Sequence, residues 1–254
     1  MTFRLDFEAA DLTQDAYLGG KLALWQPRRG YRAGVDPVLL AAAVPARTGQ
    51  SVLELGCGVG AAILCLGARV TGLSLTGVEL SKAHAALARR NGAGALEVIP
   101  ADIADLPQEL RQRQFDHVIA NPPYFDRDAS KPSAEPLREV AHGEALPLET
   151  WVRVAAKRLK PGGMVHVIHR TERLHQLIRA LPADLGSIEV LPIVSRSGRA
   201  PERIILRAKK NGRGAFKLHA PLVMHKGDRH QSDAGEDYTP LARAVLREGA
   251  ALAF

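Results

Sequence analysis

Short apolar runs alternate with amphipathic segments from residue 51 to residue 210, and this alternation constrains the fold of the chain most strongly. Alternating strands and helices are typical of a parallel, doubly wound α/β sheet. Seven strands are predicted, over residues 52–55, 75–79, 97–100, 115–120, 164–168, 188–191 and 203–207. Too few residues separate the last two for a helix, so we expect them to pair as an antiparallel hairpin at one edge of a mostly parallel, seven-stranded sheet.

The segments that flank this core are predicted to be extensions of one domain. A chain of 254 residues is long enough for one large hydrophobic core. An N-terminal hairpin is expected around Gly19-Gly20, followed by a short helix with Asp36 as its N-cap. The predicted division is 1–46 for the N-terminal extension, 47–212 for the core and 213–254 for the C-terminal extension. Helices are predicted over residues 36–40, 81–90, 148–159 and 240–247.

Composition excludes several classes of protein. No apolar run approaches the 18 residues of a membrane-spanning helix, and no basic region followed by an apolar one begins the chain, so neither a membrane protein nor a secreted protein is expected. The two cysteines, Cys57 and Cys65, give neither a disulfide framework nor a zinc spacing. We therefore expect a cytoplasmic protein without a metal site.

Positive charge is concentrated in one window. The net charge is +7, and residues 194–217 contain eight basic residues and one acid, which is also +7. Clustered positive charge indicates either a polyanionic partner or a solvated surface. A second basic cluster near the N-terminus is the other candidate; it comprises Lys21, Arg28, Arg29 and Arg32. Within the window, the residues expected to contact phosphates, beside the strand ends that hold the substrate, are Arg199, Arg203, Lys209 and Lys210.

A glycine-rich turn follows the first predicted core strand. Gly56, Gly58 and Gly60 occupy alternate positions after Glu54. Glycines at this spacing let the backbone turn sharply and let a ligand approach the main chain closely. Ala61 stands where a dinucleotide fingerprint would have its third glycine, which favours a nucleoside without a pyrophosphate, although the turn alone is weak evidence.

Polar residues end the next three strands. Glu79 ends the second, where a carboxylate can accept both hydrogen bonds of a ribose diol, and Asp102 follows the third, where it can accept a bond from an adenine amino group. Asn121-Pro122-Pro123-Tyr124 ends the fourth. Open α/β sheets bind ligands at the carboxyl ends of their strands, so these motifs are expected to meet at one edge.

The Asn121-Pro122-Pro123-Tyr124 tetrad predicts methylation of an amine. An aromatic amino or amide nitrogen is a poor nucleophile because its lone pair is delocalised. If the Asn121 side-chain oxygen and the Pro122 carbonyl each accept one N–H, the nitrogen is drawn toward tetrahedral geometry and exposes its lone pair to an electrophilic methyl group. The prolines hold the carbonyl rigidly, and Tyr124 offers a face on which a flat substrate can stack.

These motifs resemble those of class I S-adenosylmethionine-dependent methyltransferases with an NPPY motif, which have a Rossmann-like sheet. The resemblance is closest to the bacterial tRNA(Val) adenine-37 N6-methyltransferase family, because residues 34–40 (GVDPVLL) and 199–206 (RAPERIIL) resemble that family's flanking segments. It covers roughly residues 12–247. It implies S-adenosyl-L-methionine as cofactor, tRNA as partner, and Asn121, Pro122, Pro123 and Tyr124 as catalytic residues. The cofactor-binding residues that it implies are Glu54, Gly56, Cys57, Gly58, Gly60, Glu79, Leu80, Asp102, Ile103 and Asn121.

Other residues have competing interpretations. Asp36 either lies near the cofactor or is a plain N-cap. Trp25 and Tyr31 could stack a base but are interpreted as core residues of the hairpin, and Cys57 is interpreted as a packing residue. The histidines show no metal-ligand spacing, and structural roles are favoured for them.

The leading hypothesis is N6-methylation of an adenine in RNA, with tRNA as the expected substrate, because a base in a loop is unstacked at low cost. One rival is a protein glutamine N5-methyltransferase that uses the same tetrad; its family carries a separate helical N-terminal domain, whereas 50 residues precede Ser51 here. A DNA adenine methyltransferase would need a target-reading domain, which is not visible. A non-catalytic module that binds cofactor or RNA is the remaining alternative, but binding alone does not need an amine clamp.

Overall fold

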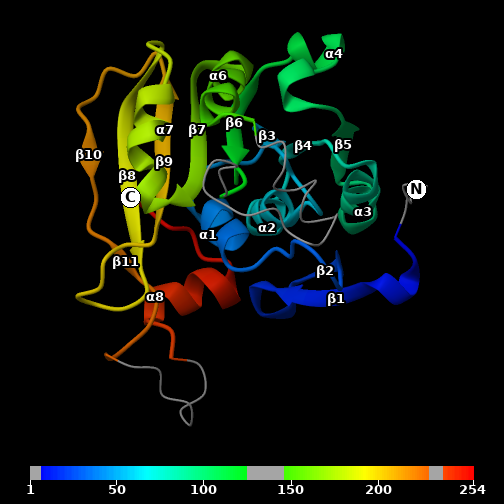
Figure 1. Ribbon diagram of the computed structural model, residues 1–254, viewed down its shortest axis with the longest axis horizontal. Helices are drawn as coiled ribbons and strands as arrows, with labels where there is room; N and C mark the ends of the chain where they lie inside the picture. The colour runs from blue at the N-terminus through cyan, green and yellow to red at the C-terminus, as the bar shows by residue number, and fades with distance from the viewer. Residues whose placement is uncertain (1–6, 125–145, 229–236) are drawn as a thin grey trace, which may run out of the picture.

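A nine-stranded sheet forms the centre of the part of the chain that the computed structural model describes, residues 7–124, 146–228 and 237–254. Its strand order is β10-β8-β9-β7-β6-β3-β4-β5, with β11 also paired to β8 (Figure 1). The strands are β3 (Ser51–Leu55), β4 (Ser74–Glu79), β5 (Leu96–Pro100), β6 (Phe115–Ala120), β7 (Leu159–Arg170), β8 (Leu185–Val194), β9 (Arg203–Lys210), β10 (Lys217–Leu218) and β11 (Leu222–Val223).

The predicted α/β fold and its mostly parallel sheet are confirmed. Strands β3 to β7 are mutually parallel, and β9 runs antiparallel to both β7 and β8. The predicted hairpin β8–β9 therefore exists, but β9 lies inside it against β7, and the outer strand β8 pairs in parallel with β10 and β11. These two strands have two residues each, which is too short for the alternation of apolar and polar side chains that predicts a strand.

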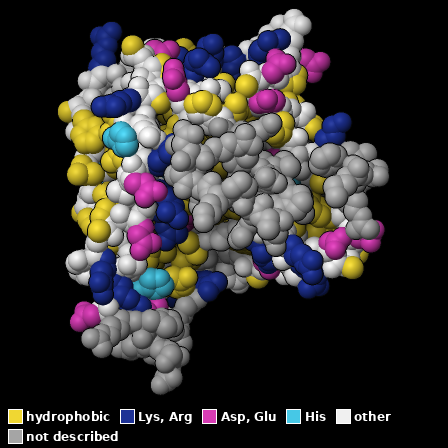
Figure 2. All heavy atoms as spheres, in the orientation of Figure 1, with side chains coloured by type: hydrophobic (Ala, Val, Ile, Leu, Met, Phe, Trp, Pro, Cys, Tyr) yellow, Lys and Arg dark blue, Asp and Glu magenta, His cyan; other side chains and the backbone are white. Residues whose placement is uncertain are grey.

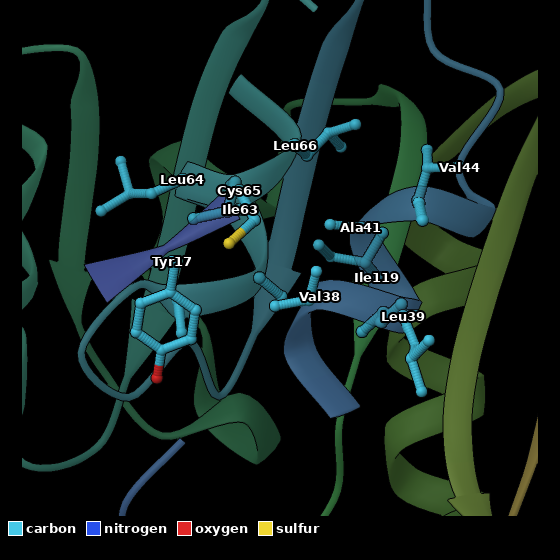
Figure 3. Close-up of a cluster of buried hydrophobic side chains, with 14 of the residues drawn as sticks. Tyr17, Val38, Leu39, Ala41, Val44, Ile63, Leu64, Cys65, Leu66 and Ile119 are labelled. Carbon is cyan, nitrogen blue, oxygen red and sulfur yellow. The ribbon is translucent and has the colours of Figure 1, made fainter. Parts of the chain in front are cut away.

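Helices cover both faces of the sheet. On one face, α1 (Asp36–Ala43), α2 (Ala61–Arg69) and α3 (Lys82–Gly92) contribute to one buried cluster, part of which is shown in Figure 3. On the other face, α4 (Gln108–Arg111), α6 (Leu148–Arg158) and α7 (Leu174–Ala180) contribute to a second cluster. Side chains of successive strand residues point to opposite faces, so Val52 of β3 joins the first cluster and Leu53 the second.

The N-terminal hairpin forms a separate two-stranded antiparallel sheet of β1 (Leu12–Tyr17) and β2 (Leu22–Pro27). Asn91 of α3 fastens it to the core: its Oδ1 accepts from the Trp25 N–H at 2.8 Å, and its Nδ2 donates to the carbonyls of Trp25 and Val59 at 3.0 and 2.9 Å. These bonds hold the hairpin beside the glycine-rich turn. Leu24 of the hairpin and Leu252 near the C-terminus belong to the same buried cluster as α1 and α2.

The C-terminal helix α8 (Pro240–Arg243) continues into a π-helical turn over Ala244–Glu248. Apolar residues of this segment pack into the first cluster, so both predicted extensions share one core with the central sheet. The boundaries after residues 46 and 212 stay predictions. Within the described residues, no helix is long and apolar enough to cross a membrane.

Local signals place most helix ends correctly. Ser81 caps α3, since its side chain accepts from the His84 N–H, and α6 ends at Arg158. The Pro-Gly-Gly signal that follows α6 lies inside the first half of β7, where Gly162 has a φ of 78°. The prediction that Asp36 caps α1 is wrong: Val35 occupies the N-cap position, and the Asp36 side chain bonds elsewhere.

Candidate active site

Four of the predicted motifs meet at one edge of the sheet. The glycine-rich turn, Glu79, Asp102 and Asn121 lie at or just beyond the carboxyl ends of β3, β4, β5 and β6, which are neighbours in the sheet. The parallel registers align these ends, because Leu55 pairs with both Val78 and Ala120. The topology therefore brings together Gly56 and Asn121, which are 65 positions apart in the sequence, as the pattern predicts.

The turn after β3 keeps an open surface at its middle glycine. Gly56, Gly58 and Gly60 all have positive φ angles, of 65°, 54° and 86°, which side chains rarely tolerate. A Cβ on Gly56 would lie 2.6 Å from the Trp151 ring, whereas a Cβ on Gly58 would meet no atom of the described residues within 4 Å. Gly56 is therefore required by packing, and the main chain at Gly58 is accessible to a ligand.

Glu79 is fixed by backbone groups on both sides. Its Oε2 accepts from the Gly58 N–H and its Oε1 from the Ser81 N–H, both at 2.8 Å. A carboxylate oxygen has two lone pairs, so each oxygen can still accept a hydroxyl of a ribose diol. Leu80, beside it, is 56% exposed and gives an apolar surface at the same edge.

Asp102 is exposed and caps a short 3-10 helix over Ile103–Asp105. Its Oδ1 accepts from the Ala104 N–H at 2.8 Å, and its Oδ2 makes no hydrogen bond with the described residues. The next side chain, Ile103, is buried in the second cluster. Asp102 therefore has the free acceptor that the adenine prediction requires.

Glu54 and Cys57 are buried residues that hold the glycine-rich turn against α2 and β4. Glu54 is 3% exposed, and its Oε2 accepts from the Ile63 N–H in the first turn of α2 at 3.0 Å. Burial raises the pKa of Glu54 well above its ordinary value. The Cys57 side chain packs on Gly77, its N–H donates to Val78, and burial raises the pKa of its thiol. Cys57 is thus a packing residue, as interpreted from the sequence.

The tetrad after β6 presents two carbonyl-type acceptors. The Asn121 Nδ2 donates to the Tyr31 hydroxyl at 3.4 Å, while its Oδ1 makes no hydrogen bond with the described residues. Pro122 is buried, and its carbonyl likewise has no partner among them. The two oxygens that the amine clamp needs are therefore available. Residues 125–127, which follow the tetrad in the sequence, lie outside the described residues.

Tyr124 is held by contacts from two other segments, the start of α1 and the end of β7. Its hydroxyl donates to Asp36 Oδ2 at 2.5 Å, and its ring centroid lies 5.2 Å from that of His169. His169 is buried at the end of β7, and its Nδ1 accepts from the Arg170 N–H. Burial, together with the nearby Arg173, lowers the pKa of His169 to about 4, so the ring packs against Tyr124 in its neutral form at pH 7.

Tyr31 differs from its interpretation as a core residue. It is 52% exposed, and its hydroxyl contacts Asn121. Trp25 does pack as interpreted: it is partly buried against the first cluster, and the Arg90 guanidinium lies 4.3 Å from its ring centroid. The two residues differ because a bend over residues 28–30 follows the hairpin. The chain leaves the hairpin there, and Tyr31 lies next to the tetrad.

The expectation that the whole basic window lies beside Asn121 is wrong for Lys209 and Lys210. Strand β9 begins at Arg203, opposite Arg170 at the carboxyl end of β7, and runs away from the site. Six residues of strand place Lys209 about 20 Å from Arg203, at the far edge. Lys210 also pairs with Asp184 there.

Two of the residues predicted to contact phosphates lie near the site edge, and one of them forms an ion pair within the protein. Arg203 pairs with Asp36 at 2.5 Å, and Arg199, in the exposed β8–β9 loop, has no side-chain partner among the described residues. In the N-terminal cluster, Arg32 pairs with Asp15, whereas Arg29 is exposed and unpartnered in the same sense. Lys and Arg side chains are accordingly spread over the visible face and not gathered into one patch (Figure 2).

Comparison with known proteins identifies the family. The model of the methyltransferase small domain family matches residues 33–193. The chain belongs to this family. It is therefore an S-adenosylmethionine-dependent methyltransferase, as its motifs predict.

Named relatives of this methyltransferase modify tRNA. Two proteins named tRNA1(Val) (adenine(37)-N6)-methyltransferase, from Actinobacillus succinogenes and Shewanella halifaxensis, are 30% and 32% identical to it. The matches cover 72% and 70% of this chain and 78% and 74% of the relatives. Among solved structures, Atu636 of Agrobacterium tumefaciens, described as a predicted O-methyltransferase, superposes with a TM-score of 0.70 at 28% identity, over 86% of this chain and 99% of the other.

A more distant structure shares the fold of this methyltransferase. The 16S rRNA N2 G1207 methyltransferase of Thermus thermophilus, solved with AdoMet and guanosine, has a TM-score of 0.54 at 22% identity and covers 78% of this chain and 50% of its own. In the methyltransferase described here, the residues at the carboxyl edge fit the family's cofactor. Its glycine turn is open at Gly58, and each oxygen of the oriented Glu79 carboxylate still has a lone pair that can accept a hydroxyl group.

The cofactor supplies an electrophilic methyl group. Within this methyltransferase, Glu79 would hold the ribose of the cofactor and Asp102 its adenine amino group. The main chain at Gly58 would line its methionine part. The described residues contain no group of three or more His, Cys, Asp or Glu side chains placed to hold a metal ion. A reaction without metal stays a prediction.

Proposed function

We propose that this methyltransferase transfers a methyl group from S-adenosylmethionine to N6 of an adenine in RNA, with tRNA as the substrate. One observation carries the proposal: the Asn121 side-chain oxygen and the Pro122 carbonyl have no partners among the described residues, and the Tyr124 ring is fixed beside them. The relatives named as tRNA1(Val) adenine-37 N6-methyltransferases support the choice of adenine and of tRNA.

The chemistry follows from the clamp. Asn121 and Pro122 would accept the two N–H bonds of the adenine amino group, so that its lone pair leaves conjugation with the ring. A bond forms between N6 and the methyl carbon while the bond from that carbon to the cofactor sulfur breaks. The nitrogen becomes acidic as it is methylated and loses one proton to water, so no strong base is required.

A loop base suits this site. Unstacking and flipping one base from a single-stranded loop costs less than extracting it from a duplex, and every base offers a flat face to an aromatic ring. Tyr124 provides that ring, with its plane fixed by Asp36 and His169. A tRNA substrate would place the reaction in the cytoplasm.

The test is product identification. The protein would be incubated with S-adenosylmethionine carrying an isotopically labelled methyl group and, separately, with bulk tRNA, rRNA and a mixture of ribosomal proteins and release factors. Digestion and mass spectrometry identify the labelled nucleoside or residue, with Asn121→Ala as control. N6-methyladenosine in tRNA that disappears in the control supports the proposal. Methylglutamine would show that the same clamp acts on a protein amide, and a methylated oxygen would overturn the amine clamp.

A further inference from the structure

Three segments that are distant in the sequence meet at the tetrad through one carboxylate. Asp36 begins α1, Tyr124 ends the tetrad, and Arg203 begins β9. The Tyr124 hydroxyl donates to Asp36 Oδ2 and the Arg203 Nη1 to Asp36 Oδ1, both at 2.5 Å. Because the two donors use different oxygens, both bonds form at once. The segments 34–40 and 199–206, whose sequence patterns the amine clamp does not explain, thus converge on Tyr124.

The contact is shielded from water. The Asp36 side chain is 15% exposed and that of Arg203 26%. Charge-assisted hydrogen bonds in such surroundings are shorter and stronger than bonds between neutral groups. Burial, reinforced by the Asp36 charge, raises the pKa of Tyr124, so the phenol keeps its proton and remains a donor at neutral pH.

The ring of Tyr124 is supported at its other side as well. The His169 ring packs against it at 57°, and the Arg170 guanidinium lies 6.0 Å from its centroid. These contacts limit sliding of the ring, whereas its hydroxyl end is fixed, among the described residues, by the bond to Asp36 alone. The orientation of the stacking face therefore depends on Asp36, and the orientation of Asp36 depends on Arg203.

We propose that Asp36 and Arg203 are positioning residues that hold the Tyr124 ring in the plane required by the methyl acceptor. The inference rests on the proposed function, in which Tyr124 stacks on a flat substrate. It gives Arg203 a role different from the phosphate contact expected from its place in the basic window. An error of about 1 Å in the position of a substrate can lower turnover by about a hundredfold, so a positioning residue has a large kinetic effect.

The test is a double-mutant cycle on kcat/KM with Asp36→Ala, Tyr124→Phe and the double variant. Tyr124→Phe keeps the ring and removes only the bond to Asp36. Each single variant should lower kcat/KM at least tenfold, mostly through kcat, and the double variant should be no worse than the weaker single. Effects that multiply in the double variant would overturn the proposal, because they would show that Asp36 and Tyr124 act independently.

The conservative variants separate positioning from structural damage. Asp36→Asn keeps an acceptor for Tyr124 and should retain more activity than Asp36→Ala. Arg203→Lys keeps the charge and should stay closer to wild type than Arg203→Gln. Asp184→Ala is the matched control, since Asp184 pairs with Lys210 at the far end of the same strand, and it should leave kcat/KM unchanged. Equal losses in conservative and non-conservative variants would assign both residues to general stability and overturn the proposal.

Cofactor affinity tests whether Asp36 belongs to the cofactor site instead. The dissociation constant for S-adenosylmethionine should stay within about twofold of wild type in every variant. A loss above tenfold in Asp36→Ala would place Asp36 in the cofactor site instead. If the wild-type protein methylates glutamine and not tRNA, the proposed tRNA substrate is wrong. The double-mutant cycle is then measured with the glutamine substrate, and the positioning proposal is still tested. If it methylates neither, both proposals fail.

Discussion

The backbone N–H of Gly58 and the carboxylate of Glu79 are joined by a 2.8 Å hydrogen bond that connects the ends of β3 and β4. The bond has two consequences. It fixes the carboxylate before any ligand arrives, and it stabilises the main chain at the glycine where the turn is open. A site built in this way loses little orientational freedom when it binds a nucleoside.

Replacing Glu79 by alanine should weaken binding of both S-adenosylmethionine and its demethylated product by about 1–3 kcal/mol, because charge-assisted hydrogen bonds to the ribose are lost. Isothermal titration calorimetry measures this directly. Glu109→Ala is a suitable control, since Glu109 lies exposed on α4. Unchanged affinity in a folded Glu79→Ala protein would remove Glu79 from the cofactor site.

Replacing Asn121 by alanine should separate binding from chemistry. Its side-chain oxygen would hold the target amine, a contact that matters mainly in the transition state. Turnover should fall by orders of magnitude while cofactor affinity stays nearly constant, as single-turnover rates and calorimetry on the same preparation would show. A rate within tenfold of wild type would mean that the tetrad is structural.

Motifs at strand ends were predictable from the sequence, because strand–helix alternation fixes which ends share an edge. Glu79, Asp102 and Asn121 lie where that argument places them. The antiparallel pairing of β8 with β9 was predicted as well, but the direction of β9 relative to the site, and so the position of Lys209 at the far edge, follows only from its pairing with β7 and the register. Charge clustering in sequence is a poor guide to clustering in space, since alternate strand residues and opposite strand ends separate neighbours.

Side-chain pairs between distant segments were not predictable. Asp36 is of a residue type favoured at an N-cap and is followed by a proline, as the start of a helix often is, and yet its carboxylate bonds to Tyr124 and Arg203. Local propensity can rank Asp at a helix start, but it contains no information about groups that tertiary packing brings within reach. The same reason explains why Trp151, which packs on Gly56, carried no signal.

Replacing Tyr31 by alanine should weaken the productive binding of RNA. The ring is exposed beside Asn121, so it can contact a base in the clamp, and its hydroxyl accepts from Asn121 Nδ2. We expect a rise in KM for RNA of tenfold or more, because base–aromatic stacking is worth about 1–3 kcal/mol. Phe216→Ala is the control, since Phe216 is 53% exposed next to β10. Equal effects of the two variants would contradict a specific role for Tyr31.

Stability should fall as the pH drops from about 6.5 toward 4. Burial lowers the pKa of His117 from 6.5 to about 4, so the unfolded chain binds a proton that the folded chain resists. Above pH 6.5 the ring is neutral in both the folded and the unfolded chain, so this group does not reduce stability. Between pH 7 and 4.5 protonation of the unfolded chain lowers the free energy of unfolding by about 2 kcal/mol. His117→Gln, which can retain the contact with Gln50, should lose less stability over this interval in urea titrations. His175→Gln, at an exposed position, should behave as wild type.

Removal of two charges at the site edge should change the salt dependence of RNA binding, whereas removal of two at the far edge should not. Arg29 lies two residues before Tyr31, Arg199 lies in the loop next to Arg203, and neither has a side-chain partner among the described residues. Each phosphate contact with a single strand releases about 0.7 of a counterion, so Arg29→Gln/Arg199→Gln should reduce the slope of log affinity against log salt by about 1.4. Lys209→Gln/Lys210→Gln removes the same charge about 20 Å away along β9 and should leave the slope unchanged. Equal slopes in the two double variants would show that the RNA follows another path across the protein, and cofactor binding in each would confirm that the site is folded.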